Sequence, residues 1–147
     1  MSNIGVVRPP QEPIGLLLAR TAKAAGRAFD DALAAAGGSR PAWLILISLI
    51  QASHRTQGEL AQAVGITGPT LTHHLAAMER QGLVTRERSA DNRRIQRVSL
   101  TEAGRVHFRR LRDNAMAHDA RLRAGLTDAE LDQFRSFLAR VGANLAG

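Results

Sequence analysis

The sequence contains no cysteine and few aromatic residues. Without cysteine the chain can form no disulfide, and it can use no thiol as a redox sensor or nucleophile. This composition is compatible with a reducing cytoplasm. Only four Phe and one Trp supply aromatic bulk, so we expect small aliphatic residues to fill the core.

Long hydrophobic runs are also missing. The longest, from Trp43 to Ile50 and broken by Ser48, is too short to cross a bilayer. The N-terminus lacks the basic start and apolar centre of a signal peptide. We therefore expect a cytoplasmic protein without a membrane partner. At 147 residues, the chain fits one domain, or one domain intertwined with a second copy of itself.

Enzyme signatures are lacking as well. The sequence has no Gly-rich phosphate loop and no nucleophile elbow, and its five histidines do not stand at zinc-binding spacings. His73 and His74 are adjacent, so on a helix they point about 100° apart and cannot easily bind one metal ion together. We expect no enzymatic activity, no cofactor and no metal. One alternative stays open, a metal site formed across a dimer by His54, His107 or His118 with carboxylates.

Positive charge, by contrast, is abundant. The formal net charge is +7, and every basic residue except Lys23 is an arginine. Arginine attracts phosphate over several ångströms and holds it with a forked pair of donors, which favours a polyanionic partner. GC-rich codons would produce the same composition, so the positions of the arginines have to decide.

Apolar spacing predicts two helices in the first third of the chain. After a loose tail at residues 1–12, a helix is expected from Pro13 to the Gly37-Gly38 stop. The segment "SRPAWLILISLIQAS" follows, with Pro41 at the expected first helical position. It is too long for a typical strand, and we expect a helix buried on most sides.

The next two elements form a helix-turn-helix. In "TQGELAQAVG", Thr56 and Glu59 have the spacing of a capping box, and Gly65 is placed to end the short helix. "GPTLTHHLAAMERQG" begins after a tight turn, with Thr67 as its cap and Gly82 as its terminator. Two short helices joined by a Gly-containing turn are typical of a helix-turn-helix.

A β-hairpin is predicted after the helix-turn-helix. Its strands, Leu83–Arg88 and Ile95–Leu100, flank the turn-forming residues "SADN", and the loop is long enough to project as a wing. Thr101 then caps a long helix that runs to about Ala124.

The last predicted helix carries a regular apolar seam. It begins at a second capping box, Thr127 and Glu130. The apolar residues that follow, at intervals of 3, 4, 3 and 4, are Leu131, Phe134, Leu138, Val141 and Leu145. This spacing is typical of a coiled-coil-like contact, and we expect the seam to mediate self-dimerisation. Packing on the chain's own first helix remains the alternative.

This order of elements is that of a winged helix, and its wing carries a family signature. "DNRRIQRVSLTEAG" closely resembles the wing motif of the multiple-antibiotic-resistance regulator (MarR) family: Asp-x-Arg, an apolar strand, Leu-Thr and Gly. The matching positions are Asp91, Arg93, Val98, Leu100, Thr101 and Gly104. "GELAQAVGITGPTLTHHLAAMERQGLVTR" is similar to the family's DNA-reading helices, and the element order agrees from about Pro13 to Leu145.

The resemblance implies a mainly α fold with a small β-hairpin wing, a winged helix-turn-helix flanked by N- and C-terminal dimerisation helices. We assign residues 39–100 to DNA binding, and 13–38 with 101–147 to dimerisation. The implied partners are duplex DNA and a second copy of the chain. Half-sites on one side of B-DNA lie about 34 Å apart, so a two-fold symmetric protein requires an inverted repeat.

Candidate DNA-binding residues lie at the start of the second helix of the helix-turn-helix and along the wing. Leu71, Leu75 and Met78 form the core side of that helix, so its N-terminal end should enter the major groove. His74 is expected to be structural instead. The expected contacts are Thr67, Gly68, Pro69, Thr70, Thr72, His73, Arg86, Arg88, Arg93, Arg94 and Arg97.

Within the wing, Arg93 is our candidate for insertion into the flanking minor groove, where narrow A·T-rich stretches concentrate negative potential. Arg88, Arg94 and Arg97 are expected to touch phosphate or solvent. By resemblance, Asp91 pairs with a wing arginine, either Arg86 or Arg93, and stiffens the loop.

The resemblance further implies a repressor released by a small aromatic or phenolic ligand. Arg20, Trp43, Ile47 and His107 are candidate pocket residues, with Trp43 as ordinary core filling as the alternative. A second functional class, a winged helix that binds RNA or protein without specific duplex binding, is disfavoured by the arginine density of the wing. The salt dependence of duplex binding would separate the two classes.

Overall fold

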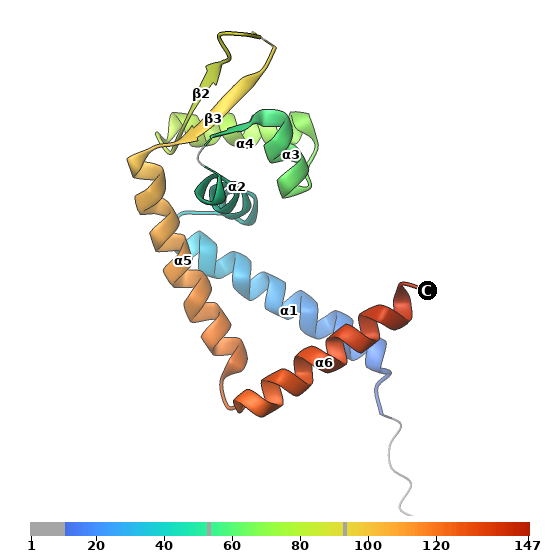
Figure 1. Ribbon diagram of the computed structural model, residues 1–147. Helices are drawn as coiled ribbons and strands as arrows, with labels where there is room; N and C mark the ends of the chain where they lie inside the picture. The colour runs from blue at the N-terminus through green and yellow to red at the C-terminus, as the bar shows by residue number, and fades with distance from the viewer. Residues whose placement is uncertain (1–10, 53, 93) are drawn as a thin grey trace, which may run out of the picture.

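The computed structural model describes residues 11–52, 54–92 and 94–147, and it is mainly α-helical with one small antiparallel sheet (Figure 1). The helices are α1 (Ile14–Ala35), α2 (Arg40–Gln51), α3 (Gln57–Val64), α4 (Gly68–Arg80), α5 (Glu102–Arg123) and α6 (Asp128–Leu145). The strands are β1 (His54–Thr56), β2 (Val84–Arg88) and β3 (Gln96–Leu100). The predicted winged helix-turn-helix is confirmed, with α3 and α4 followed by the β2–β3 hairpin.

Local capping chemistry explains most helix ends. The Thr56 hydroxyl accepts from the Glu59 N–H at the start of α3, and Gly65 ends that helix with a left-handed φ of 75°. At α6, Thr127 and Glu130 form a reciprocal capping box. Two details differ from expectation. Ser39 caps α2, which moves Pro41 to the second helical position. Thr67 is the N-cap residue of α4, as expected, but its hydroxyl donates to Thr70 and accepts no hydrogen bond from the helix backbone.

The sheet has a third strand that the sequence did not indicate. β1 pairs antiparallel with β3, with Arg55 opposite Val98, so the order is β1-β3-β2. β1 has only three residues and lies directly between two helices, too short for an alternating pattern to be visible. It places β3 at the centre of the sheet.

The core lies within the winged helix and is aliphatic, as expected from the composition. Its buried residues are Leu33, Ile45, Leu46, Leu49, Leu60, Leu71, Leu75, Met78, Leu83, Val84, Val98 and Leu111. Leu33 and Leu111 extend this core into α1 and α5. The expectation that α2 is buried on most sides was wrong for Leu44 and Ile50, which are 38% and 39% exposed.

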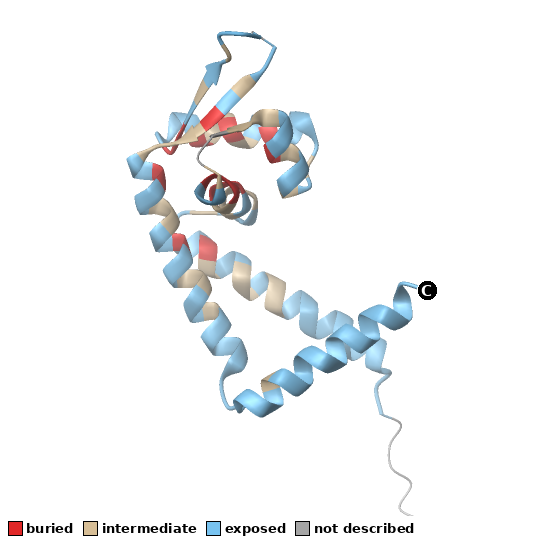
Figure 2. Ribbon diagram, viewed as in Figure 1, coloured by how far each residue is buried: buried red, intermediate tan, exposed pale blue. Residues whose placement is uncertain are grey.

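Helices α1, α5 and α6 form an open frame below the winged helix, and the exposed surface is concentrated there (Figure 2). α1 and α5 converge near the core, where the Asn114 side chain donates to the Ala32 carbonyl at 2.8 Å. α6 turns away from the end of α5. All 18 residues of α6 are described, and none of them is buried.

Within residues 11–52, 54–92 and 94–147, no single helix is long and apolar enough to cross a bilayer, and only α1 and α2 taken together, bent by 73°, have the length and composition of a broken span.

The junction between β3 and α5 requires a glycine at position 104. A Cβ there would overlap the carbonyl oxygen of Leu83 and the side chain of Leu100. We predict that Gly104→Ala lowers the free energy of unfolding by about 1–3 kcal/mol, the usual range for overpacking, in urea denaturation. Gly58→Ala is the matched control, because a Cβ at Gly58 meets nothing within 4 Å. Equal stabilities of the two variants would contradict this packing.

Candidate nucleic-acid interface

The N-terminal end of α4 is exposed, and the side of α4 that faces the core is buried. Leu71, Leu75 and Met78 pack in the core, as the sequence predicted. The residues proposed to approach DNA are all exposed: Thr67, Gly68, Pro69, Thr70, Thr72 and His73. His74, in contrast, is half-buried and lies beside His107 and Gln81 in a small cavity of about 220 Å³. α4 therefore presents short polar side chains on one end of a fixed helix.

Three hydrogen bonds determine how the hydroxyls at the start of α4 can act. Thr67 Oγ1 donates to Thr70 Oγ1 at 2.9 Å, which leaves the Thr70 proton free to donate outward. Thr72 Oγ1 accepts from Gln57 Nε2 at 2.6 Å and donates to the Gly68 carbonyl at 3.0 Å. The Thr72 proton is therefore committed within the protein. Sequence reasoning missed Gln57, because nothing in the sequence reveals a contact between α3 and α4 at this position.

The register of the hairpin separates its arginines onto two faces. Arg88 is opposite Gln96, and Glu87 is opposite Arg97. Since successive strand residues point to opposite sides, Arg88 and Gln96 share the face that carries Val98, and Arg97 lies with Glu87 on the other face. Arg97, proposed as a DNA contact, therefore does not share a face with Arg88.

A groove of about 750 Å³ lies between α3, α4 and the hairpin. Its lining residues are Thr56, Gln57, Gly58, Thr72, Arg88, Arg94, Ile95 and Gln96. Among the residues that the structure describes, this lining contains two arginines and no acidic residue. This groove brings two of the predicted wing arginines next to Thr72, and it adds the first turn of α3, which sequence analysis did not include in the site.

Arg86 is a structural residue in this chain. Its guanidinium donates to Glu79 Oε1 at 3.1 Å, and its backbone N–H donates to Glu79 Oε2 at 3.2 Å. The Arg86 side chain is only 17% exposed. The hydrogen bond from the Arg86 side chain lowers the pKa of the Glu79 carboxyl, against a smaller opposing effect of burial. The pair fixes β2 to the end of α4, so Arg86 is placed to hold the wing.

The expected pairing of Asp91 with Arg86 is therefore not found. Among the described residues Asp91 forms no salt bridge, and its backbone N–H donates to Ser89 Oγ at 3.3 Å. Glu79, seven residues before Arg86, is brought beside it by the turn at Gly82 and occupies the position of a partner. Arg93, the other candidate partner and the proposed minor-groove residue, lies outside the described residues.

The root of the wing is held by Thr101. Its hydroxyl donates to the Gly82 carbonyl at 2.6 Å and accepts from the Gly104 N–H at 3.0 Å. Its backbone N–H donates to the Leu83 carbonyl at 3.1 Å. One residue thus joins the end of α4, the end of β3 and the start of α5.

In the part of the chain that the structure describes, Trp43 and His107, two of the four residues proposed for an effector pocket, line different cavities. Arg20 forms an ion pair with Glu12 at 2.6 Å near the start of α1. Trp43 stacks on Phe108, with ring centroids 5.2 Å apart, and is partly buried against the core, in keeping with the core-filling alternative. It also lines a trough of about 440 Å³ on α5 with Arg112, Met116 and Arg123 among others.

His107 lines the small cavity beside His74, and Ile47 is half-buried on α2. Burial, with a smaller contribution from Arg110, lowers the pKa of His107, which favours its neutral form. Within the described part of the chain, no three His, Asp or Glu side chains are grouped so that they could hold a metal ion.

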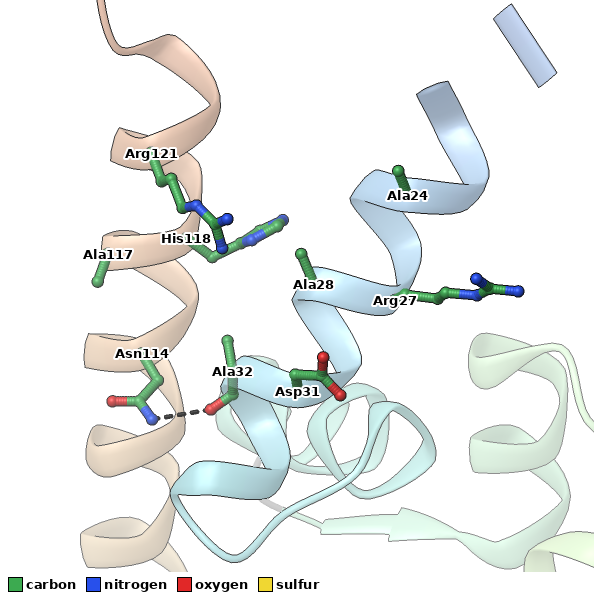
Figure 3. A pocket seen from close by; sticks show the side chains of 9 residues that line it. All are labelled: Ala24, Arg27, Ala28, Asp31, Ala32, Asn114, Ala117, His118 and Arg121. Atoms are coloured by element: carbon green, nitrogen blue, oxygen red, sulfur yellow. Dashed lines mark hydrogen bonds between the residues drawn. The ribbon is translucent and has the colours of Figure 1, made fainter. Parts of the chain in front are cut away.

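A further trough of about 680 Å³ opens between α1 and α5 (Figure 3). Its floor is formed by small side chains, including Ala24, Ala28 and Ala32 of α1. His118 and Arg121 point from α5 toward α1 across the gap. The Asn114 hydrogen bond to Ala32 closes the trough at the end nearest the core.

The predicted α6 seam faces solvent in the single chain. Leu131 is half-buried, and Phe134, Leu138, Val141 and Leu145 are exposed, up to 80% for Leu145. Phe137, which sequence analysis left out, is also exposed. The chain's own α1 does not bury the seam, and α1 adds exposed apolar residues of its own at Ile14 and Leu16.

Comparison with known proteins gives one consistent result. A model of the MarR family matches residues 37–95, which span α2, α3, α4 and the wing as far as Ile95. The solved structure of a transcriptional regulator, PA3341, is 35% identical over 91% of this chain and 98% of that chain, with a TM-score of 0.67.

Two further structures extend the comparison. The transcriptional repressor CouR, solved bound to a 23-mer DNA duplex, is 28% identical over 88% of this chain and 92% of its own, with a TM-score of 0.76. The PcaV transcriptional regulator from Streptomyces coelicolor is 21% identical over 92% of this chain and 99% of its own, with a TM-score of 0.82. At that identity the likeness to PcaV shows the fold alone.

The Glu79–Arg86 pair gives a pH-dependent prediction. Because the pKa of Glu79 is below its ordinary value of 4.5 in the folded chain, the pair stabilises the fold above that pH. The stabilisation is lost as the pH falls through the lowered pKa. Urea unfolding should therefore show Glu79→Gln less stable than the wild type at pH 7, with the difference shrinking toward zero on acidification. Glu87→Gln, on the other face of the hairpin, is the control, and a Glu79 difference that does not change with pH would refute the assignment.

Proposed function

The chain belongs to the MarR family of transcriptional regulators, and on this basis we propose that it acts in the cytoplasm as a homodimer that binds an inverted repeat in duplex DNA. We further propose that it represses transcription and that a small aromatic or phenolic acid releases it. The family comprises transcriptional regulators and not enzymes.

One observation carries the DNA-binding proposal: Thr72 of α4 and the wing arginines Arg88 and Arg94 line the same groove, and none of its described lining residues is acidic. The hydroxyl proton of Thr70 is not used in the bond with Thr67, so it can donate to an acceptor on a base edge or to a phosphate. His73 is exposed on the same helix. The proposal is supported by CouR, a repressor of similar sequence that was solved on a DNA duplex.

The homodimer is supported by the apolar surface that the single chain leaves uncovered. Exposed apolar side chains line both the start of α1 and the length of α6, and isolated chains rarely expose such contiguous surface. The open trough between α1 and α5 has a floor of small side chains, against which another helix can pack closely. A second copy of the chain would bury these surfaces and hold two winged helices at the half-site spacing.

Effector release is the finer part of the proposal. The trough beside Trp43 offers an aromatic wall together with Arg112 and Arg123. These arginines lie 3.7 Å from the carboxylates of Asp113 and Asp119, and an aromatic carboxylate would replace those exposed partners. In this proposal the trough takes the place of the pocket that the sequence suggested, of whose four residues it contains Trp43. A thermal-shift titration with benzoate-type acids should raise the melting temperature of the wild type more than that of Arg112→Ala, and no shift with any such acid would remove the effector from the proposal.

Duplex binding is tested by salt dependence and by the wing. If the dimer neutralises several phosphates, fluorescence anisotropy on genome-selected duplexes should give an affinity that falls by orders of magnitude between about 50 and 200 mM salt. Arg93→Ala should weaken binding by about 1–3 kcal/mol if this residue enters a groove.

Arg97→Ala is the matched control for Arg93→Ala, because Arg97 is an exposed arginine beside Glu87 on the far face of the hairpin. It should weaken binding only slightly and equally for all sequences. Equal, negligible losses for both variants would remove the minor-groove contact. Salt-independent or absent duplex binding by the wild type would favour the alternative of an RNA- or protein-binding module.

Dimerisation is tested on α6. Leu138→Asp places a charge in the exposed seam and should convert the dimer to a monomer in sedimentation equilibrium, because burying an unpaired carboxylate is costly. Ser136→Asp adds the same charge to the same helix outside the seam and should leave the dimer intact. A wild-type monomer at micromolar concentration would contradict the proposed assembly.

A further inference from the structure

Two residues that do not favour their own helices meet where α1 joins the winged helix. Arg40 is the first residue of α2, where the helix dipole disfavours a positive charge. Gly26 lies in the interior of α1, where glycine weakens a helix relative to alanine. Arg40 Nη2 donates to the Gly26 carbonyl at 3.1 Å, and a Cβ at Gly26 would stand only 3.3 Å from this nitrogen. The benefit of both residues therefore has to lie in the contact between them.

Arg40 holds a full turn of α1. Its Nε donates to Asp30 Oδ1 at 3.0 Å, within an ion pair between the two side chains. Its guanidinium lies over the Phe29 ring, 5.8 Å from the ring centroid. The same Phe29 ring is tilted against His118 of α5, at a centroid distance of 5.4 Å. We refer to Arg40 with Gly26, Phe29 and Asp30 as the Arg40 clamp.

The clamp acts at a distance from the point where the core fixes α1. Among the residues of α1, all of which are described, Leu33 alone is buried. Gly26 lies about two turns earlier, about 10 Å along the helix axis. Packing at Leu33 alone would let α1 swing about that point, and a second attachment two turns away resists the swing.

On its other side the clamp holds a helix that belongs to the winged helix. α2 contributes Ile45, Leu46 and Leu49 to the core, and it contacts α3, α4 and β3. α1 and α2 meet at a bend of 73° (Figure 1). The link between them passes closely against α5, since a Cβ at Gly38 would overlap the Leu111 side chain. The short link and the clamp together set this bend.

We propose that the Arg40 clamp fixes the angle between α1 and the winged helix, and thereby determines which half-site spacing the dimer accepts. The inference rests on the proposed homodimer and its duplex binding. A duplex with displaced half-sites can be bound only if the winged helices turn relative to α1, and this turn separates Arg40 from Gly26 and Asp30. Arg40 is thus a positioning residue, which raises the cost of a wrong spacing without touching DNA.

The exposure of the ion pair sets the size of the effect. The side chains of Arg40 and Asp30 are 48% and 54% exposed. An exposed pair of this kind changes an equilibrium by a factor of up to about five. A dimer has two clamps, and both have to open on a displaced duplex, so together they should contribute a factor of about ten.

Removal of the clamp should relax the spacing preference. Fluorescence anisotropy would compare a genome-selected duplex with duplexes that have one base pair added or removed at the centre, which turns one half-site by about 34° relative to the other. Arg40→Gln should bind the selected duplex within about three-fold of the wild type, and the displaced duplexes about ten-fold more tightly than the wild type does. Misfolding weakens binding to every duplex, so it cannot produce this gain.

Two further variants locate the effect. Arg135→Gln is the matched control, because Arg135 pairs with Asp132 at the same 3.0 Å but within α6, so that its loss changes no angle between elements. It should retain the wild-type spacing profile. Asp30→Ala should relax the profile in the same direction as Arg40→Gln. The double variant should gain no more on displaced duplexes than Arg40→Gln alone, because both changes open one contact.

The outcomes separate the clamp from the proposed function. If the wild type binds duplexes with strong salt dependence and Arg40→Gln keeps its spacing preference, the clamp is overturned and the proposed function stands. Equal losses on all spacings by a folded Arg40→Gln also overturn the clamp, because they would place Arg40 in binding itself. If Arg40→Gln does not fold, Asp30→Ala, which leaves α2 unchanged, decides by the same criterion. A wild-type monomer, or a wild type that binds no duplex at low salt, removes the proposed function and the clamp with it.

Discussion

The hydrogen bonds of Thr101 are the constraint on which the arrangement of the winged helix depends. A single hydroxyl accepts from the first turn of α5 and donates to the carbonyl of Gly82 after α4, while the same residue's N–H binds the carbonyl of Leu83. The close approach of α5 to Leu83 is open only to a residue without a side chain, which is why Gly104 follows at the third position. Thr101 and Gly104 therefore join the start of α5 to the end of α4 and to the root of the wing.

The Glu79–Arg86 pair performs a second positioning task, on the other side of the hairpin. It connects the last turn of α4 with β2, so the wing is held to α4 through both of its strands. The Arg86 guanidinium is thereby held by Glu79 within the chain. Arg88, which the hairpin register places opposite Gln96, and Arg94 of the loop line the groove.

Sequence reasoning was accurate where a feature is local. Caps at Thr56, Thr101 and Thr127, the glycine stop at Gly65 and the apolar face of α4 depend on residues within one or two turns of each other, and each is found. It failed where the partner is distant in the sequence or the element is short. Glu79 displaced Asp91 as the partner of Arg86, Gln57 reached Thr72 across fifteen residues, and β1 was too short to show a period.

The third strand has a mechanical consequence for the hairpin. β1 hydrogen-bonds β3 only from Arg97 to Ser99, so this part of β3 is enclosed by neighbours on both edges, while the hairpin beyond it toward Arg88 is a two-stranded ribbon. Two-stranded ribbons twist and bend more readily than three-stranded sheets. The outer ribbon can thus adapt to surfaces of different width, and the entropy lost in ordering it is confined to a few residues because its base is already rigid.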